Sequence, residues 1–449
     1  MGKYKKSPRA FPMCGRACRK RNCGAGRLLD LSVIADTTKP EKLVTAEAVR
    51  AGHPDKLCDQ IADAILDAHL ADDPNARVAV EVMATAGKIT VAGEVTSESF
   101  VNYHQVIYEQ LAKIGYGICD LCDDPAQSLE LEIRIHEQST DIAEAVQRKR
   151  EVNADIGAGD QGIMVGYATD ETPEYLPLPV VLAQKVCKAL DSAICSAPWL
   201  LTDGKAQVTV LYHGDRPVAV TDVVVSVQHT TGFDVEKIRA FITSEVLKKV
   251  IPSRYWTETT KVQINPSGRF LHGGPAADTG LTGRKLAVDA YGPVAHIGGG
   301  AMSGKDSTKV DRTGAYAARW MAKNIVAAGL ARKCEVQVAY AIGKAKPVSI
   351  SVETFGTGKV SDELLAKAVK KVFDLRPGVL IEQLHLRNVK YAPLAAYGHF
   401  GRDELDLPWE KTDRIELLLH SVELLCGYRP NTHGVRHSRL ERYGKGVLQ

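Results

Sequence analysis

The chain has 449 residues, of which 45% are hydrophobic and 25% are charged, and its formal net charge at pH 7 is +3. This composition is typical of a globular protein, and the length predicts about three domains because a single hydrophobic core stops growing below this size. Because the net charge is nearly balanced, the protein has no overall positive electrostatic field that would favour nucleic acid. No stretch reaches the ~20 apolar residues of a membrane span. We therefore expect a cytoplasmic protein.

A basic segment precedes the first folded residues. Residues 1–29 contain nine Lys or Arg and no acid, and residues 1–40 show no apolar periodicity. This pattern predicts a disordered arm. The arm could be an RNA-binding tail, an Arg-rich targeting segment or a translated leader without a role, and the sequence leaves all three open.

The first strong motif is Gly52-His53-Pro54-Asp55-Lys56, after which apolar residues recur at helical spacing. The spacing predicts a helix that begins at this turn. His53, Asp55 and Lys56 provide a hydrogen-bond donor, an oxygen ligand and a cation at the helix start, which suits a magnesium-bound polyphosphate. The alternative is that Asp55 only caps the helix and His53 is a surface residue.

Two alternating segments follow this helix. Arg77–Met83 and Lys88–Val95 flank a turn at Gly87 and predict a strand pair, because their apolar residues alternate with a period of two. Glu81 interrupts the first strand. It is either a ligand for an ion or substrate, or an ordinary solvated residue on an exposed strand.

A helix at Phe100–Ile114 and a strand at Leu129–Ile135 are predicted next, and the charged, weakly patterned residues that follow predict a loop that can close over a ligand. Gly157-Ala158-Gly159-Asp160-Gln161-Gly162 fits the dinucleotide pattern G-x-G-x-x-G. That pattern should open a helix, but a strand follows here. We therefore interpret the glycines as a tight turn that places Asp160.

The middle of the chain predicts a helix, two strands and a second helix, at Val180–Asp191, Ala206–Tyr212, Pro217–Val227 and Val235–Val250. The two strands are adjacent and antiparallel, unlike a Rossmann order. A glycine-rich turn then ends in two cations, Arg284 and Lys285.

A second glycine run, Gly298 to Asp306, contains Lys305 and is followed by a predicted helix at Asp311–Ala328. Glycines let the backbone approach an anion, and a helix N-terminus favours phosphate. Gly299 to Lys305 matches the P-loop pattern, but Asp306 stands where that pattern needs a hydroxyl for magnesium. We predict a phosphate cradle rather than a true P-loop.

Two more strands, Glu335–Ile342 and Val348–Thr354, and a helix, Ser361–Phe373, complete the pattern. The three successive blocks predict an α+β protein made of three similar α/β-sandwich domains, with mainly antiparallel or mixed sheets and helices on one face. The expected boundaries are a basic arm at 1–40, domains at 41–145, 146–272 and 273–413, and a C-terminal extension at 414–449.

Together, the motifs at Gly52–Lys56, Gly157–Gly162 and Gly298–Asp306 resemble the S-adenosylmethionine synthetase (methionine adenosyltransferase) family, and the resemblance runs from about Leu43 to Lys411. It implies transfer of the adenosyl group of ATP to methionine by attack of sulfur on C5′. The displaced triphosphate would be hydrolysed to pyrophosphate and phosphate. It also implies two Mg²⁺ ions per site, K⁺, and a dimer or tetramer with sites between subunits.

The resemblance also implies roles for single residues. His53 would contact the triphosphate near the bond that breaks, with Lys205, Arg284, Lys285 and Lys305 on the phosphates. The metal ligands would be Asp55 and Asp311 for Mg²⁺ and Glu81 for K⁺. The positions that match ATP contacts are Asp203, Arg269, Phe270 and Ala301, with Phe270 on adenine, and those that match methionine or shared contacts are Glu94, Gln138, Asp278 and Lys309. Asp160 is a further substrate contact, and residues 139–156 would form the lid.

Four positions depart from the family pattern, namely Thr140, Ile297, Met302 and Ser307. They leave the charged set intact, so they bear on the lid and the rate more than on the reaction type.

Two other function classes stay open. The same cradle could serve a nucleotide-dependent kinase or phosphohydrolase, and the basic arm could make the protein a binding module. The hypothesis of an adenosyltransferase requires His53, Lys205 and Lys305 to meet at one phosphate site.

Overall fold

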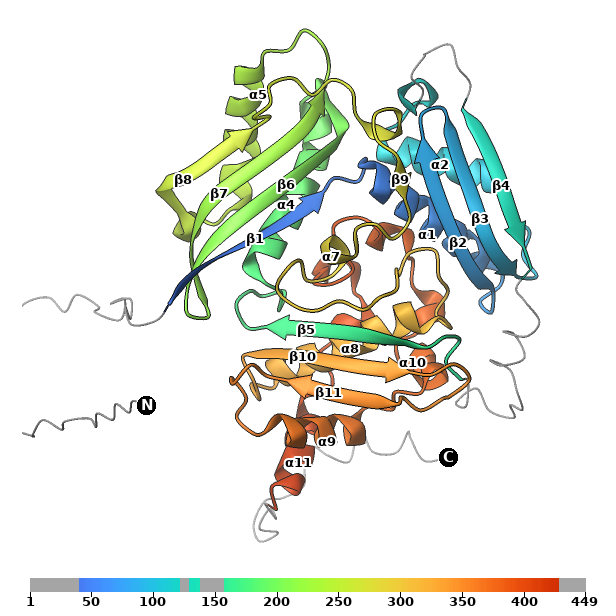
Figure 1. The fold of residues 1–449 in the computed structure, drawn as a ribbon, viewed down its shortest axis with the longest axis vertical. Coiled ribbons are helices and arrows are strands. Elements are labelled where there is room, and N and C mark those ends of the chain that lie inside the picture. Colours follow the sequence, from blue (N-terminus) through green and yellow to red (C-terminus); the bar gives the residue numbers. More distant parts are fainter. Residues whose placement is uncertain (1–39, 122–128, 138–156, 428–449) are drawn as a thin grey trace, which may run out of the picture. The chain divides into compact units, whose positions relative to one another are not determined.

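Three β-sheets organise the part of the chain that the structure describes, residues 40–121, 129–137 and 157–427 of this computed structural model (Figure 1). In spatial order, the first sheet contains β1 (Glu41–Val49), β6 (Leu200–His213), β7 (Arg216–His229) and β8 (Trp256–Ile264). The second contains β4 (Glu130–His136), β3 (Lys88–Thr96), β2 (Arg77–Thr85) and β9 (Gly280–Leu281). The third contains β11 (Ser349–Glu353), β10 (Lys333–Tyr340) and β5 (Gly162–Thr169).

Strand pairing is mostly antiparallel. The exceptions are β7 with β8 and β3 with β4, which pair in parallel. Two tight turns explain the antiparallel hairpins: Gly87 and Gly214 have φ values of 71° and 59°, a left-handed conformation that glycine adopts without strain. The predicted α+β class with mainly antiparallel or mixed sheets is confirmed.

Each sheet receives one strand from a distant part of the chain (Figure 1). β1 pairs with β6, β5 pairs with β10, and β9 pairs with β2. The sheets therefore do not coincide with uninterrupted segments of sequence. The boundaries at 41–145, 146–272 and 273–413 stay a proposal.

Helices pack against these sheets. α1 (Pro54–Asp72) contacts β2 and α2 (Tyr103–Ile114), and α4 (Leu178–Ala193) contacts β1 and β6. α8 (Val310–Ala327) contacts β5 and β10, and α9 (Asp362–Val372) contacts β11 and α11 (Ile415–Leu425). The remaining helices are α5 (Val235–Phe241), α6 (Lys248–Val250), α7 (Leu286–Asp289) and α10 (Pro377–Gln383). Short 3₁₀ turns occur at 118–121, 194–196, 253–255, 274–276, 386–388, 392–394, 403–405 and 408–410.

Two apolar cores result from this packing. One is shared by the second and third sheets with α1 and α8, and the other lies under the first sheet with α4. The sequence explains α1 well: Pro54 stands in its first turn, where a missing N–H costs nothing, and Leu57, Ile61 and Ile65 are buried along one face.

The predicted elements differ from the observed ones mainly in extent. The helix expected at Val235–Val250 is present, but its middle, Ile242–Leu247, is wound as a π-helix. The strand expected at Ala206–Tyr212 begins earlier, at Leu200, and the helix expected from Phe100 begins at Tyr103. Within the described ranges, the structure has no helix that is both long and apolar enough to cross a membrane.

Candidate active site

His53 forms the N-cap of α1, and its side chain is buried. Its Nδ1 accepts a hydrogen bond from the backbone N–H of Asp55 at 3.2 Å. Burial lowers the pKa of His53 to about 3, with further lowering by Lys285 and Lys205. The ring is therefore neutral near pH 7, and because Nδ1 accepts, its proton lies on Nε2. The alternative that His53 is a surface residue is wrong.

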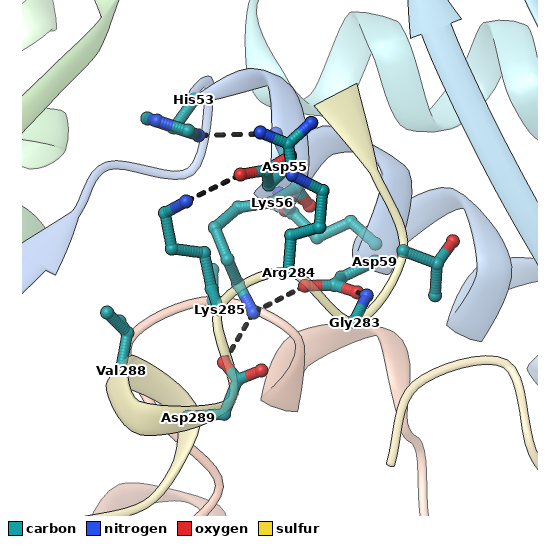
Figure 2. Close-up of polar contacts among 12 residues, drawn as sticks. His53, Asp55, Lys56, Asp59, Gly283, Arg284, Lys285, Val288 and Asp289 are labelled. Atoms are coloured by element: carbon teal, nitrogen blue, oxygen red, sulfur yellow. Dashed lines mark hydrogen bonds and ion pairs between the residues drawn. The ribbon is translucent and has the colours of Figure 1, made fainter. Parts of the chain in front are cut away.

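Asp55 joins the first turn of α1 to the loop before α7 (Figure 2). Its Oδ2 lies 2.5 Å from Lys285 Nζ, and its Oδ1 accepts from the N–H of Leu281 at 3.0 Å. Arg284 Nε lies 3.5 Å from Oδ1. Burial opposes the charge of Asp55, but the hydrogen bond from Lys285 outweighs it and keeps the pKa of the carboxyl below its usual value.

Lys205 reaches this place from β6. In the sheet, Lys205 pairs with Val49 of β1, which lies just before the motif Gly52–Lys56. The charge of Lys205 is one of those that lower the pKa of His53. Its side chain is exposed and has no hydrogen-bond or ion-pair partner in the described ranges. We call His53, Asp55, Lys205, Arg284 and Lys285 the His53 group.

Lys56 does not belong to this group, although the sequence suggested it as a phosphate-binding cation. Its ammonium is fully buried and forms ion pairs with Asp59, at 2.8 Å, and with Asp289 (Figure 2). Burial opposes its charge, but Asp289 and Asp59 raise the pKa of Lys56 above its usual value. A lysine committed to two buried carboxylates is part of the interior, so this expectation was wrong.

A second set of charges surrounds Lys305. Its Nζ lies 2.7 Å from Asp311 Oδ2 in the first turn of α8, and its backbone forms an isolated bridge with Ala79 of β2. Glu81 lies on the exposed face of β2. Partial desolvation raises the pKa of its carboxyl, against the opposing charge of Lys305. We call Glu81, Lys305 and Asp311 the Lys305 group.

Glycines shape the loop that carries Lys305, as predicted for a cradle. Gly304 has φ 77°, and a Cβ there would lie 2.1 Å from the carbonyl oxygen of Val80. A Cβ on Gly300 would lie 2.1 to 2.4 Å from the Asp311 carboxyl group. Only glycine lets this loop approach β2 and α8 so closely. The departures Ile297 and Met302 line one small hollow beside Asp311.

The other predicted residues are spread around these two groups. Asp203 is buried and accepts from the N–H of Gly274 at 2.9 Å, while Arg269 and Asp278 are exposed. The backbone N–H of Phe270 donates to His229. Glu94 lies 3.6 Å from His136, Lys309 is paired with Asp306 at 2.6 Å, Ala301 is half-buried, and Asp160 is exposed. Gln138 and the expected lid at 139–156, including Thr140, lie outside the described residues.

Within one copy of the chain, the structure brings His53, Lys205, Arg284 and Lys285 together. Lys305 lies in the other group. Across the described ranges, no hydrogen bond or ion pair directly joins a member of the His53 group to a member of the Lys305 group. No direct contact among the described residues therefore joins His53 or Lys205 to Lys305 within a single copy, and their meeting at one phosphate site stays a prediction.

The carboxylates that could bind a metal ion lie singly in the structure and not in clusters. In the ranges described, no three His, Cys, Asp or Glu side chains gather as a metal site. Asp55 and Asp311 each lie beside a lysine instead. One or two carboxylates fit Mg²⁺ when phosphate oxygens and water complete its shell, so the residues fit a cation that is bound together with a polyphosphate.

Sequence reasoning missed two acids, Asp59 and Asp63 of α1. Asp59 Oδ1 accepts from the N–H of Gly283 at 2.9 Å, and Asp63 Oδ1 accepts from the N–H of Gly304 at 2.8 Å. Their spacing from Asp55 was a visible signal, since residues four apart share a helix face and like charges there repel unless something binds them.

Three family models match the chain in succession. They are "S-adenosylmethionine synthetase, N-terminal domain" at residues 41–140, "central domain" at 155–270 and "C-terminal domain" at 272–411. The chain is also 50% identical over 398 residues to an S-adenosylmethionine synthase from Roseiflexus castenholzii, and this match covers 86% of the chain and 98% of that relative.

Proposed function

This chain belongs to the S-adenosylmethionine synthetase family and makes S-adenosylmethionine from ATP and methionine, and we propose that its two charged groups bind the triphosphate of ATP. The observation that supports this proposal is the excess of cations around His53. Lys205 and Lys285 act on the neutral imidazole of His53, and Arg284 and Lys285 share the single carboxylate of Asp55. Such an excess of positive charge attracts an anion.

In the proposed reaction, the methionine sulfur attacks C5′ of ATP. A C5′–S bond forms, the C5′–O bond breaks, and its electron pair leaves with the triphosphate, so the product is a sulfonium and no proton moves. The triphosphate is then hydrolysed to pyrophosphate and phosphate. Thioether sulfur is already nucleophilic, so catalysis is alignment and stabilisation of the leaving charge.

His53 is suited to the bridging oxygen of the leaving group. It is neutral, its Nδ1 is engaged by the N–H of Asp55, and its Nε2–H is left to donate. A neutral donor stabilises negative charge as it grows without adding another cation to a crowded place. Lys205, Arg284 and Lys305 would take the phosphate oxygens. At about 4 Å, a unit charge pair is worth ~1 kcal/mol in water and ~4 kcal/mol at an effective dielectric of about 20.

For the cations, we propose Asp55 and Asp311 as ligands of two Mg²⁺ ions and Glu81 as the ligand of K⁺. Each Asp now holds a lysine, so a bound triphosphate would draw the lysine to its oxygens and leave the carboxylate for the metal. Bound Mg²⁺ would neutralise phosphate charge.

The remaining predicted residues are proposed as substrate contacts. Asp203, Arg269, Phe270 and Ala301 would contact ATP, with Phe270 stacked on adenine. Glu94, Gln138, Asp160, Asp278 and Lys309 would bind methionine or both substrates. Support is strongest for Asp203, because its burial raises the pKa of a carboxyl that lies between Gly274 and Lys205.

We further propose that a complete site needs two copies of the chain, in a dimer or tetramer. Among the described residues, no hydrogen bond or ion pair joins the two charged groups within one copy, and apolar side chains beside both groups are exposed. Met83 is 39% exposed, and its strand partner Leu281 is 38% exposed. A second copy would cover this surface and bring its own His53 group. A cytoplasmic location also stays a proposal.

A product assay tests the proposed reaction. The full chain is incubated with ATP, Mg²⁺ and K⁺, with and without methionine, and the sulfonium product, phosphate and pyrophosphate are measured. The proposal expects the sulfonium, with phosphate and pyrophosphate released in equal amounts when methionine is present. Phosphate release that does not depend on methionine, with no sulfonium, would indicate a hydrolase instead.

A second assay tests the two-copy site. Molecular mass in solution is measured beside turnover over a range of protein concentrations. The proposal expects specific activity to fall as the protein dissociates, and full activity in a monomer would contradict it.

A further inference from the structure

Helix α1 carries four aspartates at four-residue intervals, and each accepts a hydrogen bond from the backbone of a distant segment of the chain. Asp55 accepts from Leu281, Asp59 from Gly283, Asp63 from Gly304, and Asp67 from Tyr391 and Ala392. Four like charges on one helix face repel one another, so such a column persists only when each carboxylate is bound. We call these residues the aspartate column.

The two middle members bind closely similar turns. Gly283 has φ 76° and is followed by Arg284 and Lys285, and Gly304 has φ 77° and is followed by Lys305. In both turns, the glycine N–H that donates to α1 lies one residue before a cation of the site. A carboxylate that fixes this N–H therefore fixes the direction in which the next side chain leaves the backbone.

Buried cations hold the two carboxylates in place. Asp59 Oδ2 pairs with Lys56, which also pairs with Asp289 at the end of α7. Asp63 Oδ1 lies 2.5 Å from Arg312 Nη2, and Arg312 Nε also donates to the carbonyl of Met302 in the cradle at 2.7 Å. Asp59, Asp63 and their cations are all fully buried, so solvent does not weaken these contacts.

We propose that Asp59 and Asp63 are positioning residues of the adenosyltransferase reaction: through Gly283 and Gly304, they place the cations that meet the triphosphate. This inference rests on the proposed function of those cations. In this proposal, the single helix α1 aligns both charged groups, because Asp59 positions a cation of the His53 group and Asp63 positions Lys305. An error of about 1 Å in such alignment costs up to ~100-fold in rate.

Asp67 provides a matched control on the same face of the same helix. It also accepts backbone N–H groups, at 2.8 and 3.0 Å, but the loop that it holds, at Tyr391 and Ala392, carries no residue of either charged group. Burial raises the pKa of both carboxyls, although Asp63 is fully buried beside Arg312 and Asp67 is only half-buried. A purely structural role predicts that all three variants lose stability and keep kcat/KM for ATP.

The experiment compares Asp59→Asn, Asp63→Asn and Asp67→Asn in the full chain with ATP, Mg²⁺, K⁺ and methionine. Melting temperature, kcat and the KM of each substrate are measured. We expect kcat/KM for ATP to fall at least about tenfold in the first two variants, with the KM for methionine unchanged. Asp67→Asn should lower only the melting temperature. If all three variants lose stability alike and keep kcat/KM for ATP, the proposal is overturned.

A double-mutant cycle keeps the test valid if Asp59→Asn folds poorly. Gly283→Ala perturbs the same hydrogen bond from its other end, because an alanine at φ 76° is strained and its Cβ would lie 2.6 Å from the Ala301 side chain. Both changes should be non-additive with Arg284→Ala in kcat/KM for ATP, because Arg284 is the cation that directly follows Gly283. Additive losses would refute positioning. A wild-type chain that makes no sulfonium would instead refute the proposed function itself.

Discussion

Two clusters of basic side chains in this molecule have opposite surroundings. Around His53, Lys205 has no ion-pair partner in the described ranges, and Arg284 is 49% exposed and 3.5 Å from the carboxylate that it shares with Lys285. Inside the third sheet's core, Arg319 and Lys323 of α8 both bind Glu410 at 2.7 to 3.0 Å. Arg319 also donates to the carbonyls of Tyr167, Glu174 and Tyr175.

The difference separates cations that stabilise the fold from cations that wait for a ligand. Every donor nitrogen of Arg319 is occupied, so adding an anion there would gain nothing. The His53 group has more positive than negative charge, and its Lys205 and Arg284 are exposed to solvent, so an incoming polyphosphate supplies the missing charge. Changes in the interior cluster should therefore affect stability, and changes in the open cluster should affect turnover.

The largest expected effect is at Glu410. Glu410→Gln leaves Arg319 buried without a charged partner, which typically costs ~3–5 kcal/mol of unfolding free energy. Urea denaturation measures this loss, while kcat of the remaining folded protein should stay close to that of the wild type. A Glu410→Gln variant that is as stable as the wild type but inactive would contradict the view that the interior cluster stabilises the fold.

Lys205→Met should show the opposite behaviour. The side chain keeps its length and loses its charge, and removal of one charge-stabilising donor at a reacting group typically lowers kcat by ~10²–10³-fold. The melting temperature should not change, because the ammonium has no partner in the described part of the chain. Steady-state sulfonium synthesis and a thermal scan on the same sample measure both, and unchanged kcat would show that Lys205 does not meet the substrate.

The pH dependence of stability sharpens the same contrast. Burial opposes the charge of Glu410, but Arg319 outweighs it and holds the pKa of this carboxyl below its ordinary value of 4.5. A depressed folded-state pKa stabilises the protein above the unfolded pKa, and this stabilisation is lost as pH falls through the folded value.

The difference in unfolding free energy between wild type and Glu410→Gln should therefore shrink as pH falls below about 4.5. Urea titrations at several pH values measure it. A constant difference across that range would contradict the assignment of the pKa to the Arg319 pair.

The smallest effect is expected at an exposed pair. Lys367 and Glu363 of α9 lie 2.8 Å apart, one helical turn from each other, and both are largely solvated. Lys367→Ala should cost only ~0.3–0.5 kcal/mol, and this loss should disappear in high salt. A loss of unfolding free energy as large as that of Glu410→Gln would show that burial does not explain why the interior ion pairs matter more for stability than the exposed ones.

Local signals in the sequence predicted much of this molecule. The α1 turn with its Pro54, the hairpin at Gly87 and the helix after the glycine run all depend on neighbouring residues, and all are present. The strand pattern left Glu81 undecided; in the structure, desolvation raises the pKa of its carboxyl and the charge of Lys305 opposes this rise.

What the sequence could not show are contacts between distant residues. The pairing of β1 with β6 and the two-residue strand β9 depend on segments more than 150 residues away. Burial of Lys56 could not be predicted either, because its partner Asp289 stands 233 positions later.

The exchange of strands among the sheets governs when the chain can fold during its synthesis. β1 leaves the ribosome first but finds its partner only after residues 200–213 have emerged, and β2 must wait for residues 280–281. Most of the chain must therefore be made before any of the three sheets is complete. Nascent intermediates will present open strand edges for a long time, and this protein should depend on chaperones more than a protein of the same length whose domains fold one after another.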